Sequence, residues 1–263
     1  MIVDLFMFDD EFDVLECRLY ELDGLVDLHV AVEGDHAFSG LPKPYHLSES
    51  GRYDDRVRII RAETGSVDDI DDDYLWRSAP WCYQSTHEFW RREVKQRDAV
   101  EPLLASLPPE TTILVGDLDE IPGREVLRAL RAAPRPASVL RMLHCLYDFS
   151  WVHPHAWWGT VIGTIGELGT RPSYVRANRG TDYEMVVHGG WHLSWFGDAE
   201  RRKEKLAKSA HQEWSDVGDR IGDEYPLIGK HLNGTDLIRR DPVSLPRWVI
   251  DGHAPASWLK ERE

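Results

Sequence analysis

The chain has 263 residues, of which 42% are hydrophobic and 29% are charged, and its formal net charge is -15. These proportions are typical of a globular protein with a substantial core. The acidic excess disfavours a nucleic-acid-binding protein, because such binding depends on Lys and Arg that neutralise phosphates.

The first half of the chain predicts alternating strands and helices. Residues 2–8 predict a strand, residues 12–22 carry apolar side chains at helical spacing, and residues 26–32 alternate as a second strand. Residues 57–60 predict a third strand, and residues 83–104 predict a helix that ends before two prolines. This order is typical of βαβ units around a parallel sheet.

Two carboxylates follow the next predicted strand. The apolar run 111–115 leads into Asp117-Leu118-Asp119. Ligands of open α/β folds bind at the carboxyl edge of the sheet, and carboxylate oxygens suit a divalent cation that holds a diphosphate. The pattern therefore indicates nucleotide-sugar chemistry. Alternatively, the pair forms a turn before a helix, which Glu120 and Pro122 would favour.

The second half of the chain is less regular. Strands are predicted at 139–146 and 159–165, with a tryptophan-rich loop between them. A further strand at 189–197 precedes a basic helix at 199–214. The acidic run 68–73 lacks the glycine and terminal glutamate of an EF-hand and predicts a solvated loop. Four side chains near the tryptophan-rich loop lack standard zinc spacing: His144, Cys145, His153 and His155.

The cysteines and the N-terminus indicate a cytoplasmic protein. Cys17, Cys82 and Cys145 are odd in number and widely separated, which predicts buried thiols in a reducing compartment. The first residues lack a basic leader and are interrupted by Asp4, so no signal peptide is expected. Eighteen consecutive apolar residues occur nowhere, so no membrane-spanning helix is expected either.

Separated motifs, read together, resemble glycosyltransferase family 17, the family of the β-1,4-mannosyl-glycoprotein 4-β-N-acetylglucosaminyltransferase. The resemblance covers roughly residues 1–235 and depends on several segments rather than one. These segments are 8–18, 32–44, 90–97, Gly116-Asp117-Leu118-Asp119-Glu120-Ile121-Pro122, 158–160, 190–194 and 209–213.

The resemblance implies a fold, a reaction and a cofactor. The fold would be an α/β, GT-A-type and Rossmann-like fold with a central, mostly parallel sheet. One catalytic domain would span 1–263, with a nucleotide-sugar-binding half at 1–135 and an acceptor-side half with closing helices at 136–263. The reaction would be an inverting transfer from a UDP-sugar, typically UDP-N-acetylglucosamine, to a hydroxyl of a glycan or other acceptor, with Mn²⁺ or Mg²⁺. The membrane anchor, stem and lumenal disulfides of the animal enzymes are missing from this sequence.

The resemblance also assigns candidate site residues. Asp119 would ligate the metal directly, Asp117 would meet the metal or the ribose, and His192 would return to the same cation; His192 could equally be a core histidine. Candidate nucleotide-binding side chains are Phe8, Glu11, Glu33, Lys43, Arg92, Arg97, Asp117 and Lys205. For the charged members of this set, helix capping, helix-surface ion pairs and plain solvent exposure are the alternatives.

An inverting transfer needs a general base, and geometry decides that role before pKa does. The candidates are Asp148, Glu120, Glu184, Asp182 and Glu213. Asp148 ranks first because it opens the tryptophan-rich loop, where Trp151, Trp157 and Trp158 offer flat faces for sugar rings. Two alternative functions are a non-catalytic carbohydrate-binding protein and a metal-dependent phosphohydrolase, although the halo-acid type of the latter carries its Asp pair after the first strand.

Overall fold

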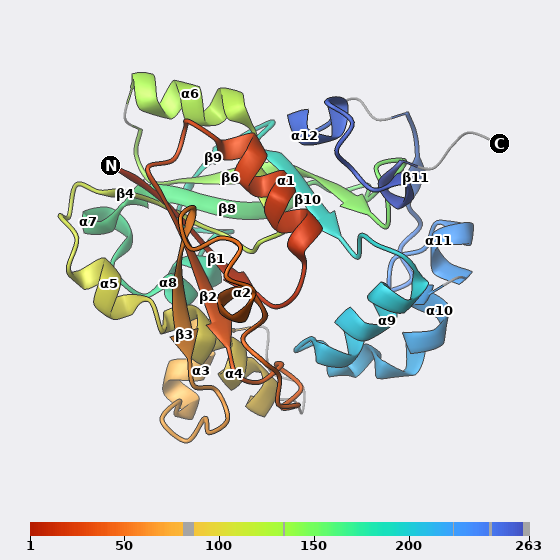
Figure 1. Ribbon diagram of the computed structural model, residues 1–263, viewed down its shortest axis with the longest axis horizontal. Helices are drawn as coiled ribbons and strands as arrows, with labels where there is room; N and C mark the ends of the chain where they lie inside the picture. The colour runs from red at the N-terminus through yellow and green to blue at the C-terminus, as the bar shows by residue number, and fades with distance from the viewer. Residues whose placement is uncertain (81–86, 134, 223, 242–243, 260–263) are drawn as a thin grey trace.

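A mixed β-sheet forms the centre of the molecule (Figure 1). The computed structural model describes residues 1–80, 87–133, 135–222, 224–241 and 244–259. The main path of the sheet runs β11-β7-β6-β8-β4-β1-β2-β3. The strands on this path are β1 (Ile2–Phe8), β2 (Leu28–Gly34), β3 (Val57–Ala62), β4 (Thr112–Val115), β6 (Ser138–Leu146), β7 (Trp151–Val152), β8 (Trp157–Thr164) and β11 (Ile238–Arg239).

The strands of the first half pair in parallel. In the register of β1, Leu5 lies between Val30 of β2 and Val115 of β4, and β2 pairs in parallel with β3. The order β3-β2-β1-β4 brings the carboxyl ends of β1, β2 and β4 to one edge. The predicted α/β fold with a central sheet of parallel strands is therefore confirmed for this half of the chain.

The strands of the second half extend the same sheet with mixed directions. β8 is antiparallel to both β4 and β6. Off the main path, β10 (Gly190–Ser194) pairs in parallel with β6 and antiparallel with β5 (Glu120–Pro122), while β9 (Glu184–Val186) pairs in parallel with β6. The strand expected at 189–197 is thus shorter than predicted, and β5 and β9 were not predicted.

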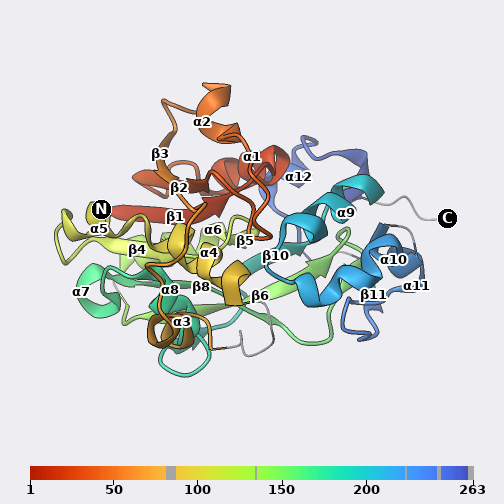
Figure 2. The same ribbon diagram turned by 90° about the horizontal axis from the view of Figure 1, so that it is seen from below.

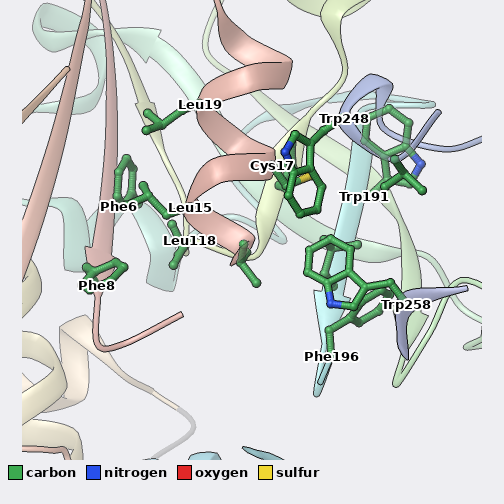
Figure 3. Close-up of a cluster of buried hydrophobic side chains, with 14 of the residues drawn as sticks. Phe6, Phe8, Leu15, Cys17, Leu19, Leu118, Trp191, Phe196, Trp248 and Trp258 are labelled. Atoms are coloured by element: carbon green, nitrogen blue, oxygen red, sulfur yellow. The ribbon is translucent and has the colours of Figure 1, made fainter. Parts of the chain in front are cut away.

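Side chains of β1 alternate between two hydrophobic layers, as the period of a strand requires. Phe6 and Phe8 belong to one cluster with residues of α1 (Phe12–Leu22) and with Trp191, Trp248 and Trp258. Figure 3 shows α1 between the two phenylalanines and these tryptophans. Val3 and Leu5 pack in the other cluster, with residues of α5 (Glu101–Ala105) and α8 (Pro172–Ala177). Figure 2 shows α1 and α12 on one side of the sheet, and α3 and α8 on the other.

The remaining helices are short. They are α2 (His46–Ser50), α3 (Asp72–Ser78), α4 (His87–Asp98), α6 (Arg124–Ala132), α7 (Ile165–Leu168), α9 (Ala199–Lys208), α10 (Gly218–Gly222), α11 (Glu224–Ile228) and α12 (Arg247–Ile250). Two 3₁₀ turns follow α9 and α12: Gln212–Val217 and Ala256–Trp258. Over the described residues, no helix is both long enough and apolar enough to cross a membrane.

Two predicted helices have different bounds in the structure, and one predicted buried cysteine lies outside the described residues. The helix expected at 83–104 is two helices, α4 and α5, and residues 83–86 lie outside the described part. The basic helix expected at 199–214 ends at Lys208, where the chain continues into a 3₁₀ turn. Cys17 and Cys145 are buried free thiols, as predicted, while Cys82 is not among the described residues.

Candidate active site

Arg18 holds the acidic loop between β4 and β5 in place. Its side chain is fully buried and donates hydrogen bonds to the backbone carbonyls of Asp117, Leu118 and Glu120, at 3.0, 3.1 and 2.8 Å. Its other nitrogens donate to Asp4 at 2.6 and 2.9 Å, so the guanidinium charge is balanced inside the core. The carbonyls of this loop therefore point inward to α1, and its carboxylates remain available to the other side.

The acidic loop forms one wall of a cleft of about 410 Å³ at the carboxyl edge of the parallel strands. β10, which pairs with β5 directly beside this loop, and β6, α9 and α4 contribute the other lining side chains. Among the described residues that line this cleft, the charged ones are Asp9, Asp10, Glu11, Glu93, Asp117 and Asp119 against Lys43, Arg97, Arg176, Arg179, Lys205 and Lys208. Acidic and basic side chains are therefore matched in number within the cleft.

Asp117 is held by two arginines. Arg97 of α4 contacts one carboxylate oxygen at 2.8 Å, and Arg176 of α8 pairs with the other. Burial alone would raise the pKa of Asp117, but the two guanidinium groups outweigh it and hold the pKa well below its ordinary value. Asp117 is thus a fixed anion whose partners are cations of the protein.

Asp119 faces a lysine and a histidine. Lys205 of α9 lies 3.0 Å from one carboxylate oxygen, and His192 Nε2 lies 3.5 Å from the other. Lys205 also contacts Glu11, at 2.8 Å, and so bridges carboxylates that follow β1 and β4. Burial tends to raise the pKa of Asp119, yet Lys205 and His192 hold it well below normal. The pKa of Glu11 is raised, chiefly by burial and by the neighbouring charge of Asp119.

Comparison with known proteins identifies the family. The model of Glycosyltransferase family 17 matches residues 1–213, which is most of the chain. The chain belongs to glycosyltransferase family 17. This confirms the resemblance read from the separated motifs, and it gives no support to the carbohydrate-binding or phosphohydrolase alternatives.

Curated relatives of this family 17 chain are distant and longer. The β-1,4-mannosyl-glycoprotein 4-β-N-acetylglucosaminyltransferase of Rattus norvegicus is 24% identical over 313 residues, which cover 99% of this chain and 54% of the relative. The Homo sapiens protein of the same name is 25% identical over 250 residues, covering 80% and 43%. The chain thus spans about half the length of these relatives.

Solved structures similar to this chain align at low scores. S. aureus TarS (residues 1–349) gives a TM-score of 0.40 at 10% identity, covering 86% of this chain and 73% of that one. M. tuberculosis glucosyl-3-phosphoglycerate synthase gives a TM-score of 0.37 at 12% identity, covering 95% and 92%. The assignment to family 17 therefore depends on sequence, and the geometry of the cleft is taken from this structure alone.

The structure brings several of the predicted nucleotide-binding residues to the cleft. Phe8, Glu11, Lys43, Arg97 and Lys205 line it, and Lys43 forms an ion pair with Asp9 at 3.2 Å.

Two other predicted nucleotide-binding residues are engaged elsewhere. The Glu33 carboxylate accepts hydrogen bonds from the amides of Leu47 and Ser48 at the start of α2. Arg92 is buried against Gly40 and pairs with Glu88, one helical turn away. Glu33 therefore binds the first turn of a helix, as one alternative proposed, whereas the ion pair of Arg92 involves a buried guanidinium rather than one at the helix surface.

None of the candidate bases that the structure describes lines the cleft. Glu120 is fully buried and bound by Arg176 at 2.6 Å and by the indole N–H of Trp157 at 2.7 Å. Asp148 is buried and accepts hydrogen bonds from the Ser150 amide and hydroxyl. The others are Glu184 and Asp182, which are exposed outside the cleft lining, and Glu213, whose side chain lies outside the described residues.

Further histidines line the cleft beside the predicted His192 and Trp157, and the sequence analysis gave two of them, His144 and His231, no role there. The ring centroids of His144 and His192 are 4.7 Å apart and the rings are stacked. The Trp157 ring also stacks on His192, with 4.4 Å between the ring centroids. Burial lowers the pKa of His144 well below its ordinary value, and burial lowers that of His231 to about 4, so both imidazoles are neutral near pH 7. The alternation of side chains along β6 could have indicated that His144 faces the cleft, because its neighbour Cys145 belongs to the core cluster beneath the sheet.

The three predicted metal ligands do not converge. Asp119 and His192 are adjacent and offer an oxygen and an imidazole nitrogen, donors that suit a cation such as Mn²⁺. Asp117 faces Arg97 and Arg176 instead. Within the described part of the chain, no set of three His, Cys, Asp or Glu side chains has the geometry of a metal site. Two protein donors fit a cation whose other ligands come from a bound diphosphate and water.

Proposed function

We propose that this chain transfers a sugar from a UDP-sugar, preferably UDP-N-acetylglucosamine, to a hydroxyl group of a glycan or similar acceptor, with inversion at the sugar carbon. Membership of family 17 together with the acidic loop at the carboxyl edge of the sheet carries the proposal. The choice of donor follows the names of the curated relatives, of which this chain covers about half.

The nucleotide end of the proposed donor fits the β1 side of the cleft. Phe8 ends β1 at the cleft, near the position where a nucleotide binds in parallel α/β folds, while its own ring is buried in the core beside α1. Lys205 and Lys208 of α9 line the same cleft. Their positive charges can stabilise the diphosphate that leaves when the bond to the sugar breaks.

A divalent cation is part of the proposal, and Asp119 and His192 are the side chains that would hold it. When bound, such a cation would neutralise charge on the leaving diphosphate. Other cleft residues would keep these two donors in position for the sugar nucleotide. Arg97 and Arg176 hold the acidic loop at Asp117, and Trp157 packs beside His192. Neutral His144 and His231 leave the acceptor side without fixed charge, which suits an uncharged sugar.

Measuring released UDP tests the proposal directly. The chain is incubated with UDP-N-acetylglucosamine, UDP-glucose and UDP-galactose, with and without Mn²⁺, and slow hydrolysis is expected even without an acceptor. Asp119→Asn should abolish UDP release while the thermal transition stays within a few degrees of wild type. Glu184→Gln is the matched control, because this exposed carboxylate lies outside the cleft lining and should retain full activity.

A second measurement checks donor binding without turnover. UDP with Mn²⁺ should raise the melting temperature of the wild-type chain by mass action. The proposal is rejected if no UDP-sugar is hydrolysed and UDP with Mn²⁺ leaves the melting temperature unchanged.

A further inference from the structure

One face of α9 carries three cations that are paired with acidic residues across the cleft. Arg201, Lys205 and Lys208 are spaced by four and three residues and therefore share a side of the helix. Arg201 and Lys208 contact the two oxygens of Asp10, at 2.7 and 2.6 Å. Lys205 alone reaches the acidic loop itself.

The position of α9 is fixed from the opposite side of the helix. Its N-terminus is capped by Asp198, which accepts from the Arg201 amide at 2.9 Å. Arg202 is buried and donates to the carbonyls of Gly197, Ile221 and Gly222, which attaches α9 to the C-terminal end of α10. Figure 1 shows α9 and α10 together beside β10. The cations are thus presented by an anchored helix.

Lys205 places its own positive charge between two carboxylates of the cleft. Its ammonium group lies 2.8 Å from Glu11 and 3.0 Å from Asp119, and it lies 5.7 Å from the ring centroid of Trp195. Asp119 is also the carboxylate that faces His192. One of the two protein donors proposed for the metal is therefore already neutralised by the protein's own side chain.

We infer that Lys205 keeps free divalent cations away from Asp119 and admits the cation together with a nucleoside diphosphate. A divalent ion at Asp119 and His192 would lie close to the ammonium of Lys205, and like charges at such distances repel strongly in a partly buried site. Diphosphate oxygens remove this conflict, because they supply negative charge to both cations and let Lys205 leave Asp119. Binding of metal and diphosphate is then positively coupled. This inference depends on the proposed donor site.

Opposite shifts in two affinities test the inference. Mn²⁺ binding is measured by electron paramagnetic resonance without nucleotide, and UDP binding by calorimetry in the presence of Mn²⁺. Lys205→Met should bind Mn²⁺ alone about tenfold more tightly and UDP about tenfold more weakly than wild type, a change of the size usual for coupled sites. Lys203→Met is the matched control, since Lys203 pairs with Glu200 on the exposed side of the same helix. It should leave both affinities unchanged.

An unchanged or weaker affinity of Lys205→Met for Mn²⁺ alone would overturn the inference. Lys205→Gln repeats the test if the methionine variant does not fold, and Lys205→Arg, which keeps the charge, should behave like wild type toward Mn²⁺ alone. Failure of the proposed function gives a different result: the wild-type chain would then bind no UDP even with Mn²⁺, while the comparison with Mn²⁺ alone would still decide the role of Lys205.

Discussion

Replacing Arg18 by methionine removes the group that joins α1 to the acidic loop. The Arg18 side chain is 0% exposed, as is that of its partner Asp4. The substitution keeps most of the apolar stem but deletes two hydrogen bonds to Asp4 and three to the carbonyls of residues 117, 118 and 120. Of the side-chain contacts that described residues make with the Asp4 carboxylate, the one with His29 at 2.9 Å would remain.

The expected loss of stability follows from these contacts. Removing one partner of a buried ion pair typically costs about 3–5 kcal/mol, because the other charge stays buried. The three backbone carbonyls that lose Arg18 raise the cost further, by about 1–3 kcal/mol for each acceptor left without a donor, unless the loop moves toward water. We therefore expect the free energy of unfolding to fall by at least about 4 kcal/mol. For a chain of this size, that corresponds to a fall in melting temperature of about 8–16 °C.

Equilibrium urea unfolding measures the effect, with Arg56→Met as the matched control. Arg56 pairs with Glu16 at the surface, at 3.3 Å, so its loss should cost less than about 1 kcal/mol. Burial alone would raise the pKa of Asp4, but Arg18 and His29 hold it well below its ordinary value. The ion pair therefore stabilises the fold above the ordinary carboxyl pKa, and this stabilisation is lost as the pH falls below it. An Arg18→Met variant within about 1 kcal/mol of wild type at pH 7 would refute the reasoning.

Two further changes probe the strand that carries His192 and the histidines of the cleft. Gly190→Ala should prevent folding or lower the melting temperature severely, because φ is +133° and a Cβ would overlap the Ile121 carbonyl oxygen; Gly24→Ala, where φ is +71° with open space, should cost only about 1 kcal/mol. Circular-dichroism melting curves compare the two. The pKa of His231 is lowered to about 4, so the fold loses stability as the pH falls from the ordinary histidine value toward 4. His231→Gln should reduce this loss between pH 6.5 and pH 4, and an unaltered pH profile of the melting temperature would contradict it.

The parallel half of the fold was predictable because its signals are local. An apolar run marks β1, apolar alternation marks β2, and the apolar run before Asp117 marks β4. A sheet of parallel strands brings their carboxyl ends to one edge. The short strands β5 and β9 were not predictable in this way, since each has three residues and depends on pairing with a distant strand.

Side-chain direction limited the prediction of the site. Asp148 follows a predicted strand, but Tyr147 has a φ of +69° and the chain turns so that the carboxylate caps Ser150. Arg18 and Arg176 were not identified, because the residues that they contact are 99 and 59 positions away from them in the sequence. Such long-range ion pairs depend on packing between elements, which periodicity does not reveal.

The charge of the cleft determines how this acidic chain would bind the proposed UDP-sugar donor, which is itself acidic. A net charge of -15 opposes binding of an extended nucleic-acid backbone, yet acidic and basic side chains are equal in number along the described lining of the cleft. Each carboxylate at the inner end is already paired, Asp117 with arginines and Asp119 with Lys205. A diphosphate entering this cleft must therefore exchange partners with existing ion pairs rather than fill a vacant positive site. Exchange favours a ligand that brings its own cation, because the carboxylates released by the lysines then gain a new positive partner.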